Sequence, residues 1–267
     1  MRLNTIIAEP KTPSDLPPLV IVHGLYGSAK NWGAISKRLA QGNVCPARRV
    51  VAVDLRNHGD SPWGEDASYP ALASDLAETI EAECGGRADV LGHSMGGKAS
   101  MQLALTRPEL VNRLIAADIA PVAYENHGHL AYIRAMKGVD LSTVNRRAAA
   151  EPQLRDGVPD RALRAFLLQS LAVEEDGTAR WKLNLDALEA HMPDIVGWPG
   201  TEGEFTGPTL FVHGANSDYV GPEARPQIKR LFPAARFVAV KEAGHWLHAE
   251  QPEAFVQTVG GWLKATD

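Results

Sequence analysis

The segment VLGHSMGGK, residues 90–98, places Ser94 two residues after Gly92 and two residues before Gly96. An apolar run precedes the serine and a helical pattern follows it, so the segment predicts a sharp turn from a strand into a helix. Such a turn exposes the serine hydroxyl and tolerates only small residues at the two glycine positions. The motif therefore predicts that Ser94 is a nucleophile.

A serine hydroxyl is a weak nucleophile near neutral pH and needs a base within hydrogen-bond distance. His245 is the candidate among nine histidines, because EAGHWLHAE follows the last predicted strand and precedes the terminal helix. A loop in this place carries the histidine to the sheet edge at which Ser94 lies. We expect His248, three residues later, to have a structural role.

The attacked carbonyl group also needs hydrogen-bond donors for the negative charge that develops on its oxygen. HGLYGS, residues 23–28, follows the run LVIV, and its glycines allow backbone N–H groups to face the site. We predict that the donors are the backbone amides of Leu25 and of Met95, the residue after the nucleophile.

Four further side chains near these positions are candidates for contact with a substrate. Tyr26, Trp32 and Trp246 are predicted to form an apolar wall of the substrate pocket, with core packing as the alternative for the two tryptophans. Lys98 could contact an acidic substrate, but we expect it to be exposed to solvent on its helix.

The sequence predicts neither a metal nor a cofactor. His127 and His129 form an H-x-H pattern, but no carboxylate or thiol accompanies them in a ligand spacing. We therefore expect these two side chains to be solvated rather than bound to a metal ion.

The elements that would position these residues alternate along the chain. Short apolar runs that are rich in Val and Ile predict strands at residues 19–24, 49–55, 88–92, 113–121, 209–214 and 236–240. LNTIIAE near the start predicts an edge strand. Helical patterns occupy residues 31–40, 69–83, 96–111, 222–232 and 252–265. This alternation predicts the α/β class, with a mostly parallel central sheet flanked by helices.

Residues 122–205 interrupt this alternation. They contain no convincing strand, and helix-like patterns cover residues 126–138, 161–175 and 184–196. Some eighty residues are far too many for an ordinary connection between two strands. We therefore predict a core formed by residues 1–121 and 206–267, with residues 122–205 inserted as a helical cap.

Composition narrows the range of partners. The formal net charge is -5, and no cluster of Lys and Arg provides the basic patch that nucleic acid requires. No signal-peptide pattern and no run of about 18 apolar residues is present. Cys45 and Cys84 form no C-x-x-C pair, which fits a reducing compartment. The expectation is a soluble cytoplasmic protein that acts on a small molecule, without nucleic acid or membrane, and of undetermined oligomeric state.

Five motifs, taken together and in order, resemble the α/β-hydrolase superfamily: HGLYGSAKNW, VVAVDLRNHGDS, VLGHSMGGK, VHGANSDYV and EAGHWLHAE. The resemblance is closest to the small YbfF-like esterases, also called the abhydrolase-domain 11 group. DIAP at residues 118–121 and WKLNLDALEAH at residues 181–191 are similar to that subgroup as well. The resemblance implies an α/β-hydrolase fold and an ester hydrolase with a serine nucleophile.

The acid that orients the histidine departs from the general superfamily motif. The superfamily motif H-G-x-x-D would put it at position 217, where this chain has Ser217, with Asp218 next to it. The resemblance to the YbfF-like group implies an alternative arrangement. In that group the acid lies in the DIAP motif, and a serine stands where other family members have the aspartate of H-G-x-x-D. We predict Asp118 as the acid and Ser217 as an auxiliary hydrogen-bonding partner. Asp218 is the alternative, and Asp186 in the cap is a third candidate.

Together, these residues predict a serine hydrolase that cleaves carboxylic esters of short to medium acyl chains through an acyl-enzyme intermediate. The same three residues also suit a thioesterase, a lactonase or another α/β-hydrolase reaction. A ligand receptor or binding protein with low turnover is the alternative of another class. The physiological substrate is beyond what the sequence predicts.

Overall fold

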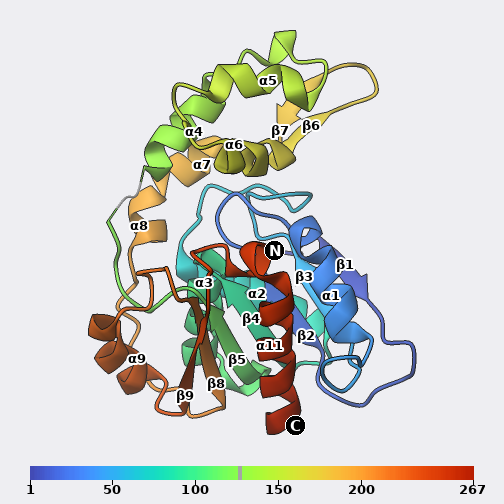
Figure 1. The fold of residues 1–267 in the computed structure, drawn as a ribbon, viewed down its shortest axis with the longest axis vertical. Helices are drawn as coiled ribbons and strands as arrows, with labels where there is room; N and C mark the ends of the chain where they lie inside the picture. The colour runs from blue at the N-terminus through green and yellow to red at the C-terminus, as the bar shows by residue number, and fades with distance from the viewer. Residues whose placement is uncertain (126–127) are drawn as a thin grey trace.

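The computed structural model describes residues 1–125 and 128–267 (Figure 1). Within these residues seven strands form one sheet in the order β1-β3-β2-β4-β5-β8-β9. The strand at one edge, β1, pairs antiparallel with β3, and the remaining neighbours in the sheet are parallel. The predicted α/β class and its mostly parallel sheet are confirmed. The strands are β1 (Thr5–Ala8), β2 (Leu19–Val22), β3 (Val50–Val53), β4 (Ala88–His93), β5 (Val111–Ala117), β8 (Thr209–Gly214) and β9 (Ala235–Val240).

Helices cover both faces of this sheet, which explains why strands β2 and β3 are apolar at every position. Leu19 and Ile21 of β2 belong to the core that α1 and α11 close on one face. Val20 and Val22 belong to the core that α2, α3 and α9 close on the other face. These helices are α1 (Gly33–Ala40), α2 (Tyr69–Glu83), α3 (Met95–Thr106), α9 (Arg225–Leu231) and α11 (Pro252–Thr266).

Between β5 and β8 the chain leaves the sheet and forms a helical segment, residues 129–196, which we name the cap segment. In Figure 1 it lies beyond one end of the sheet, at the top of the view. The division at residues 122 and 205 stays a prediction. The elements of the cap segment are α4 (His129–Lys137), α5 (Arg147–Leu154), α6 (Arg161–Leu167), β6 (Leu171–Val173), β7 (Ala179–Trp181), α7 (Leu185–Ala190) and α8 (Met192–Val196).

Strands β6 and β7 contradict the expectation that this region holds no strand, and the helix predicted for residues 161–175 ends early. The two strands pair antiparallel, with Leu171 opposite Trp181. The turn between them closes because the Glu174 amide donates to the Thr178 carbonyl at 2.8 Å. Gly177 supplies a positive φ of 85° in this turn. Hairpin pairing therefore overrides the helical pattern of this stretch.

Hydrogen bonds connect the cap segment to the sheet-bearing part of the chain at separate places. The Asn184 amide donates to the Asn57 carbonyl at 3.0 Å, beside α7. The Tyr69 hydroxyl of α2 donates to the Ile195 carbonyl of α8 at 2.5 Å. These contacts fix the C-terminal part of the cap segment over the carboxyl edge of the sheet.

The helices and the two cysteines bear on the expected environment of the protein. None of the helices in the described ranges is long and apolar enough to cross a bilayer. Cys45 and Cys84 are free and buried. Burial raises the pKa of the Cys84 thiol to about 11, so this cysteine is a packing residue rather than a reactive thiolate.

Candidate active site

Ser94 is the single residue between the end of β4 and the start of α3. Its backbone has φ 53° and ψ -122°, a conformation that residues with a side chain rarely adopt. A Cβ atom on Gly92 would lie 2.3 Å from the Gly96 carbonyl oxygen, and one on Gly96 would lie 2.3 Å from the His23 carbonyl oxygen. The two glycines are therefore required by close backbone contacts around the serine.

His245 links this serine to a carboxylate. Its Nε2 lies 3.0 Å from the Ser94 Oγ, and its Nδ1 lies 2.8 Å from the Asp118 Oδ2. An ionised carboxylate only accepts hydrogen bonds, so Nδ1 carries the proton in this pair and Nε2 accepts from the serine hydroxyl. The histidine comes from the loop between β9 and α10 (Leu247–Glu250). Three segments that are far apart in the sequence thus meet in one hydrogen-bonded chain.

Asp118, directly after β5, is fully buried and has a positive φ of 51°. Besides the bond from His245, its carboxylate accepts from the Gly214 amide at 2.9 Å and from the Ser217 hydroxyl at 2.5 Å. The predicted acid and its predicted auxiliary serine therefore lie together at His245. Asp218, by contrast, is exposed.

The third candidate acid lies away from this chain of hydrogen bonds. Asp186 in α7 is 85% exposed and forms an ion pair with Lys137 of α4, with 2.5 Å between oxygen and nitrogen. Asp186 therefore belongs to a surface ion pair between two helices of the cap segment.

Aromatic rings hold the His245 imidazole in place. Tyr219 stacks on it with 4.1 Å between the ring centroids, and Trp246 meets it edge-on at 5.8 Å. The His93 Nε2–H donates to the His245 carbonyl at 2.8 Å. Burial, followed by the neighbouring histidines, holds the pKa of His93 well below its usual range, so this ring stays neutral. The sequence pattern did not identify Tyr219 or His93 as part of the site.

The two predicted donor amides lie on opposite sides of the serine in the chain. Leu25 belongs to the loop after β2, and Met95 is the first residue of α3. Both residues border a cavity that Ser94 also borders. Whether these amides bind an oxyanion stays a prediction.

Two buried histidines set the shape of the loop that carries Leu25. The His23 Nδ1–H donates to the Gly24 carbonyl at 2.7 Å, while its Nε2 accepts from the Leu55 amide at 3.0 Å. The Tyr26 amide donates to the His58 Nε2 at 3.2 Å. Burial, followed by the nearby His23, lowers the pKa of His58 to about 3. The ring therefore stays neutral and can accept this bond across the pH range in which enzymes work.

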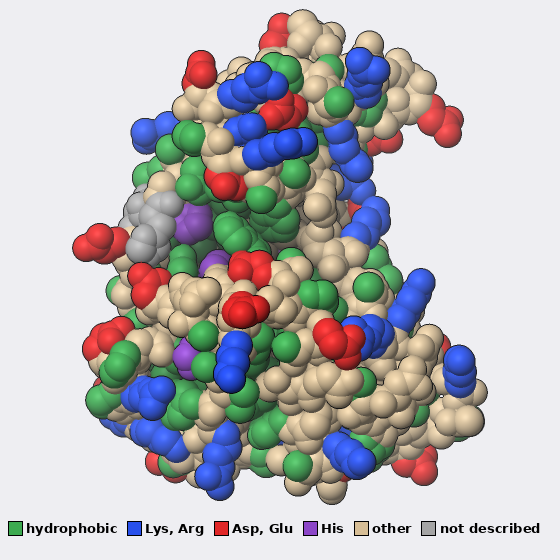
Figure 2. Space-filling view, in the orientation of Figure 1, with side chains coloured by type: hydrophobic (Ala, Val, Ile, Leu, Met, Phe, Trp, Pro, Cys, Tyr) green, Lys and Arg blue, Asp and Glu red, His purple; other side chains and the backbone are tan. Residues whose placement is uncertain are grey.

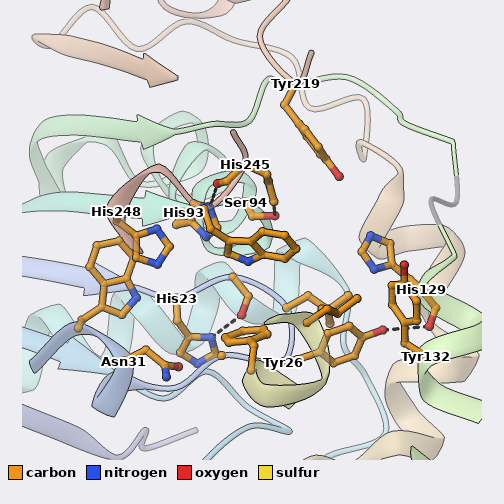
Figure 3. A pocket seen from close by; sticks show the side chains of 17 residues that line it. His23, Tyr26, Asn31, His93, Ser94, His129, Tyr132, Tyr219, His245 and His248 are labelled. Atoms are coloured by element: carbon orange, nitrogen blue, oxygen red, sulfur yellow. Dashed lines mark hydrogen bonds between the residues drawn. The ribbon is translucent and has the colours of Figure 1, made fainter. Parts of the chain in front are cut away.

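A cavity of about 170 Å³, partly open to solvent, lies over Ser94 and His245. Figure 2 shows hydrophobic and histidine side chains gathered in a hollow between the cap segment and the sheet. The three predicted wall residues all border this cavity, which we name the main cavity; its lining includes Tyr26, Trp32, Tyr132, Leu163, Phe166, Trp246 and His248 (Figure 3).

The wall residues differ in how they are held. Trp32 is buried and stacks on His248, with 4.4 Å between the ring centroids. Trp246 is 39% exposed and lies at the margin of the cavity near Phe166 of α6. Trp32 therefore packs in the core and also forms part of the cavity wall. His248, which we expected to have a structural role, borders the cavity as well.

A smaller cavity borders Ser94 from another side. It shares Leu25, Ser94, His129 and Tyr219 with the main cavity but has Lys98 and Met95 in its own wall. We name it the lysine cavity.

The expectation that Lys98 is exposed is wrong, because the side chain is 1% exposed. Its Nζ donates to the Val196 carbonyl at 2.9 Å and to the Gly197 carbonyl at 2.5 Å, at the end of α8. The Tyr124 ring lies 4.6 Å from Nζ. The cap segment therefore covers a position of α3 that a helical pattern alone would place in solvent.

The histidine pair considered as a metal ligand is only partly described. His127 lies outside the described residues, whereas His129 begins α4 and borders both cavities. Among the described residues, no group of three or more His, Cys, Asp and Glu side chains is arranged to hold a metal ion. That the protein works without a metal or cofactor stays a prediction.

Comparisons with known proteins place this site in context. Residues 19–258 match the model of the alpha/beta hydrolase family. The "sn-1-specific diacylglycerol lipase ABHD11" of Mus musculus is 42% identical over 253 residues, which cover 93% of this chain and 81% of that protein. "Esterase YbfF" of Escherichia coli (strain K12) is 35% identical over 263 residues, which cover 98% and 99%. A solved structure, "Marine microorganism esterase", has a TM-score of 0.90 and 37% identity, covering 98% and 99%.

Proposed function

Because this chain belongs to the alpha/beta hydrolase family, we propose that it is a serine esterase that hydrolyses small carboxylic esters. The observation that carries the proposal is the hydrogen-bonded chain from the Ser94 Oγ through His245 to Asp118, with distances of 3.0 and 2.8 Å. The names of the relatives, esterase and lipase, support the same reaction. The predicted resemblance to the YbfF-like and abhydrolase-domain 11 esterases is confirmed.

In the first half of the proposed reaction, the Ser94 Oγ attacks the ester carbonyl while His245 Nε2 takes its proton. The bond from carbonyl carbon to alcohol oxygen then breaks, and His245 gives the proton to the leaving alcohol. In the second half, His245 removes a proton from water, which attacks the acyl carbon. The bond from this carbon to the Ser94 Oγ then breaks, His245 returns the proton to Oγ, and the acid is released. Asp118 fixes the imidazole tautomer and stabilises its positive charge.

We assign the oxyanion site to the amides of Leu25 and Met95. Both residues are adjacent to Ser94 in space, and the Leu25 loop is fixed by the hydrogen bonds of His23 and His58. Removal of one such donor typically costs about a hundredfold to a thousandfold in rate.

The main cavity supports an ester whose apolar part is of moderate size. Its wall combines Tyr26 and Trp32 of the core with Leu163 and Phe166 of the cap segment. We propose that residues 122–205 act as a cap that closes this cavity over the core of residues 1–121 and 206–267. The free buried thiols of Cys45 and Cys84 support a cytoplasmic location.

Hydrolysis of a series of p-nitrophenyl esters, from acetate to decanoate, tests the proposal. We expect the wild type to turn over the shorter esters and Ser94→Ala to fall to the rate of the uncatalysed reaction. If the wild type releases p-nitrophenol no faster than Ser94→Ala, the chain is not an esterase for these substrates. Slow release of one equivalent without turnover would favour the alternative of a low-turnover binding protein.

A further inference from the structure

Lys98 is a buried cation without an anionic partner. Nothing except burial displaces its pKa, which falls to about 7, and among the described residues no carboxylate forms an ion pair with it. Its two hydrogen bonds go to the carbonyls of Val196 and Gly197, which leave one of the three ammonium donors available. Buried charges in proteins are normally paired, so an arrangement of this kind fits an anion that arrives with a ligand.

The surroundings of the ammonium group favour its charged form only weakly. The Tyr124 and Tyr69 rings lie 4.6 and 5.7 Å from Nζ and attract the cation through their faces. The other ionisable groups that border the lysine cavity are His129, Tyr219 and the exposed Glu125. Carbonyls and rings thus hold the ammonium group in place, but no fixed charge in the described part of the chain neutralises it.

The position of Lys98 relative to the reacting groups decides which part of an ester it would meet. His245 must protonate the leaving alcohol, and His245 borders the main cavity. Lys98 and Met95 border the lysine cavity, which reaches the same Ser94 from another side. The alcohol therefore belongs in the main cavity, and the acyl chain extends from Ser94 into the lysine cavity.

We propose that the lysine cavity binds an acyl chain that ends in a carboxylate, so that the preferred substrates are half-esters of short dicarboxylic acids. The substrate carboxylate then takes the place beside Lys98 that no protein anion fills. This inference rests on the proposed esterase function and specifies its acyl side. The reaction consumes one water and yields the dicarboxylate, the alcohol and one proton.

A pair of esters with equal shape and different charge isolates this interaction. Monobenzyl succinate carries the carboxylate, and benzyl succinamate replaces it with a neutral amide of similar size. Benzyl alcohol release, followed by chromatography, gives kcat/KM for each ester. We expect the wild type to favour the half-ester by about ten- to a hundredfold at pH 6, the usual range for a hydrogen bond to a charged group.

Substitutions of Lys98 test the origin of the preference. Lys98→Met should bring the ratio of the two kcat/KM values close to one, whereas Lys98→Arg, which keeps the charge, should retain part of it. Lys264→Met, which removes an exposed lysine of α11, is the matched control and should keep the wild-type ratio. Because the ratio compares two esters on one variant, a general loss of activity in Lys98→Met cancels.

The pH dependence of the wild-type ratio tests the same idea without any variant. The ammonium form of Lys98 predominates below pH 7 and is lost above it, while the substrate carboxylate stays ionised throughout. Any effect of pH on the catalytic groups cancels, because the ratio compares two esters on the same protein. The preference should therefore fall as the pH rises from 6 to 8.5.

Three outcomes overturn the inference, and they are distinguishable from one another. If the wild type hydrolyses the neutral ester equally well, the lysine cavity does not select an anion. If the preference survives in Lys98→Met and is constant with pH, another group provides it and Lys98 only connects α3 to the cap segment. If neither ester is hydrolysed in a Ser94-dependent way, the proposed function itself fails, and the inference falls with it.

Discussion

Asp118 occupies a position at which three donors converge on one carboxylate. The Gly214 amide binds one oxygen, and the Ser217 hydroxyl shares the other with His245. These bonds fix the plane of the carboxylate and so the tautomer of the imidazole. The hydroxyl of Ser217 therefore acts on the histidine through the acid rather than directly.

Replacement of this acid tests its role against that of its neighbour. In Asp118→Asn, the amide can donate to the His245 Nδ1 and favours the tautomer in which Nε2 carries the proton and cannot accept one from Ser94. We expect kcat for p-nitrophenyl butyrate to fall by about 10⁴-fold at pH 7. Asp218→Asn, which changes an exposed side chain, should keep the wild-type rate. The reverse pattern would make Asp218 the acid.

The sequence predicts a site residue where a motif specifies both the residue type and the local structure around it. Ser94, His245 and Asp118 follow from a turn motif, a loop position and a resemblance, and the structure brings them together. Lys98 shows the limit, because a helical pattern specifies the side that faces the sheet but not what covers the other side. Its burial depends on α8, almost a hundred residues later in the chain, whose carbonyls accept its hydrogen bonds.

At the scale of elements, the turn between β4 and α3 depends on backbone packing. Gly96 lies against the carbonyl oxygens of Val22 and His23, at the end of the neighbouring strand β2. This contact lets the first turn of α3 approach the sheet and brings Met95 beside the serine. The glycine spacing of the motif is therefore a packing requirement before it is a catalytic one.

Two glycine-to-alanine substitutions in helices should have opposite effects on stability. Gly96→Ala places a Cβ 2.3 Å from a backbone oxygen and should lower the free energy of unfolding by about 2–3 kcal/mol. Gly261→Ala in α11 meets no atom within 4 Å and should raise it by about 0.5–1 kcal/mol. Urea denaturation followed by circular dichroism measures both. Equal effects of the two variants would show that the close contact at Gly96 does not matter.

The strands of the sheet were predictable because each one is a short apolar run that ends at a residue unfavourable in a strand. The hairpin of β6 and β7 was not, because LAV at residues 171–173 is as compatible with a helix as with a strand. Its conformation is decided by pairing with residues 179–181, across a turn that contains Gly177. Non-local partners of this kind leave little trace in a local pattern.

At the scale of the whole molecule, segments that are far apart in the sequence form the site together, beneath the cap segment. The main cavity has walls from the sheet loops and from α4 and α6, while the lysine cavity adds α2, α3 and α8. The alternation of strands and helices predicts the sheet edge at which this happens. The shape and polarity of the two cavities depend on how the cap segment lies over that edge, which no local pattern describes.

Buried neutral histidines should make the fold less stable in mild acid. Burial lowers the pKa of His58 and His248 to about 3, whereas an unfolded histidine binds a proton near pH 6.5. The stabilisation is complete above pH 6.5 and is lost as the pH falls from 6.5 toward 3. For His58 the slope is about 1.4 kcal/mol per pH unit.

Urea denaturation at pH 7.5, 6 and 5 measures this dependence. We expect the free energy of unfolding of the wild type to decrease over this range. In His58→Gln, the side-chain amide can accept from the Tyr26 amide and donate to the Arg56 carbonyl, as the His58 ring does, but it does not titrate. This variant should show a shallower decrease. A stability that is constant from pH 7.5 to 5 would contradict the assignment of a neutral His58.

The central claim is that Ser94 carries an acyl group during ester cleavage, and the intact mass of the protein tests it most directly. We would quench the wild type and Ser94→Ala with acid during reaction with p-nitrophenyl butyrate and measure both masses. We expect a wild-type species heavier by one butyryl group, located on Ser94 by peptide mapping, and no such species in Ser94→Ala. Turnover without any adduct on Ser94, or an adduct that persists in Ser94→Ala, would contradict it.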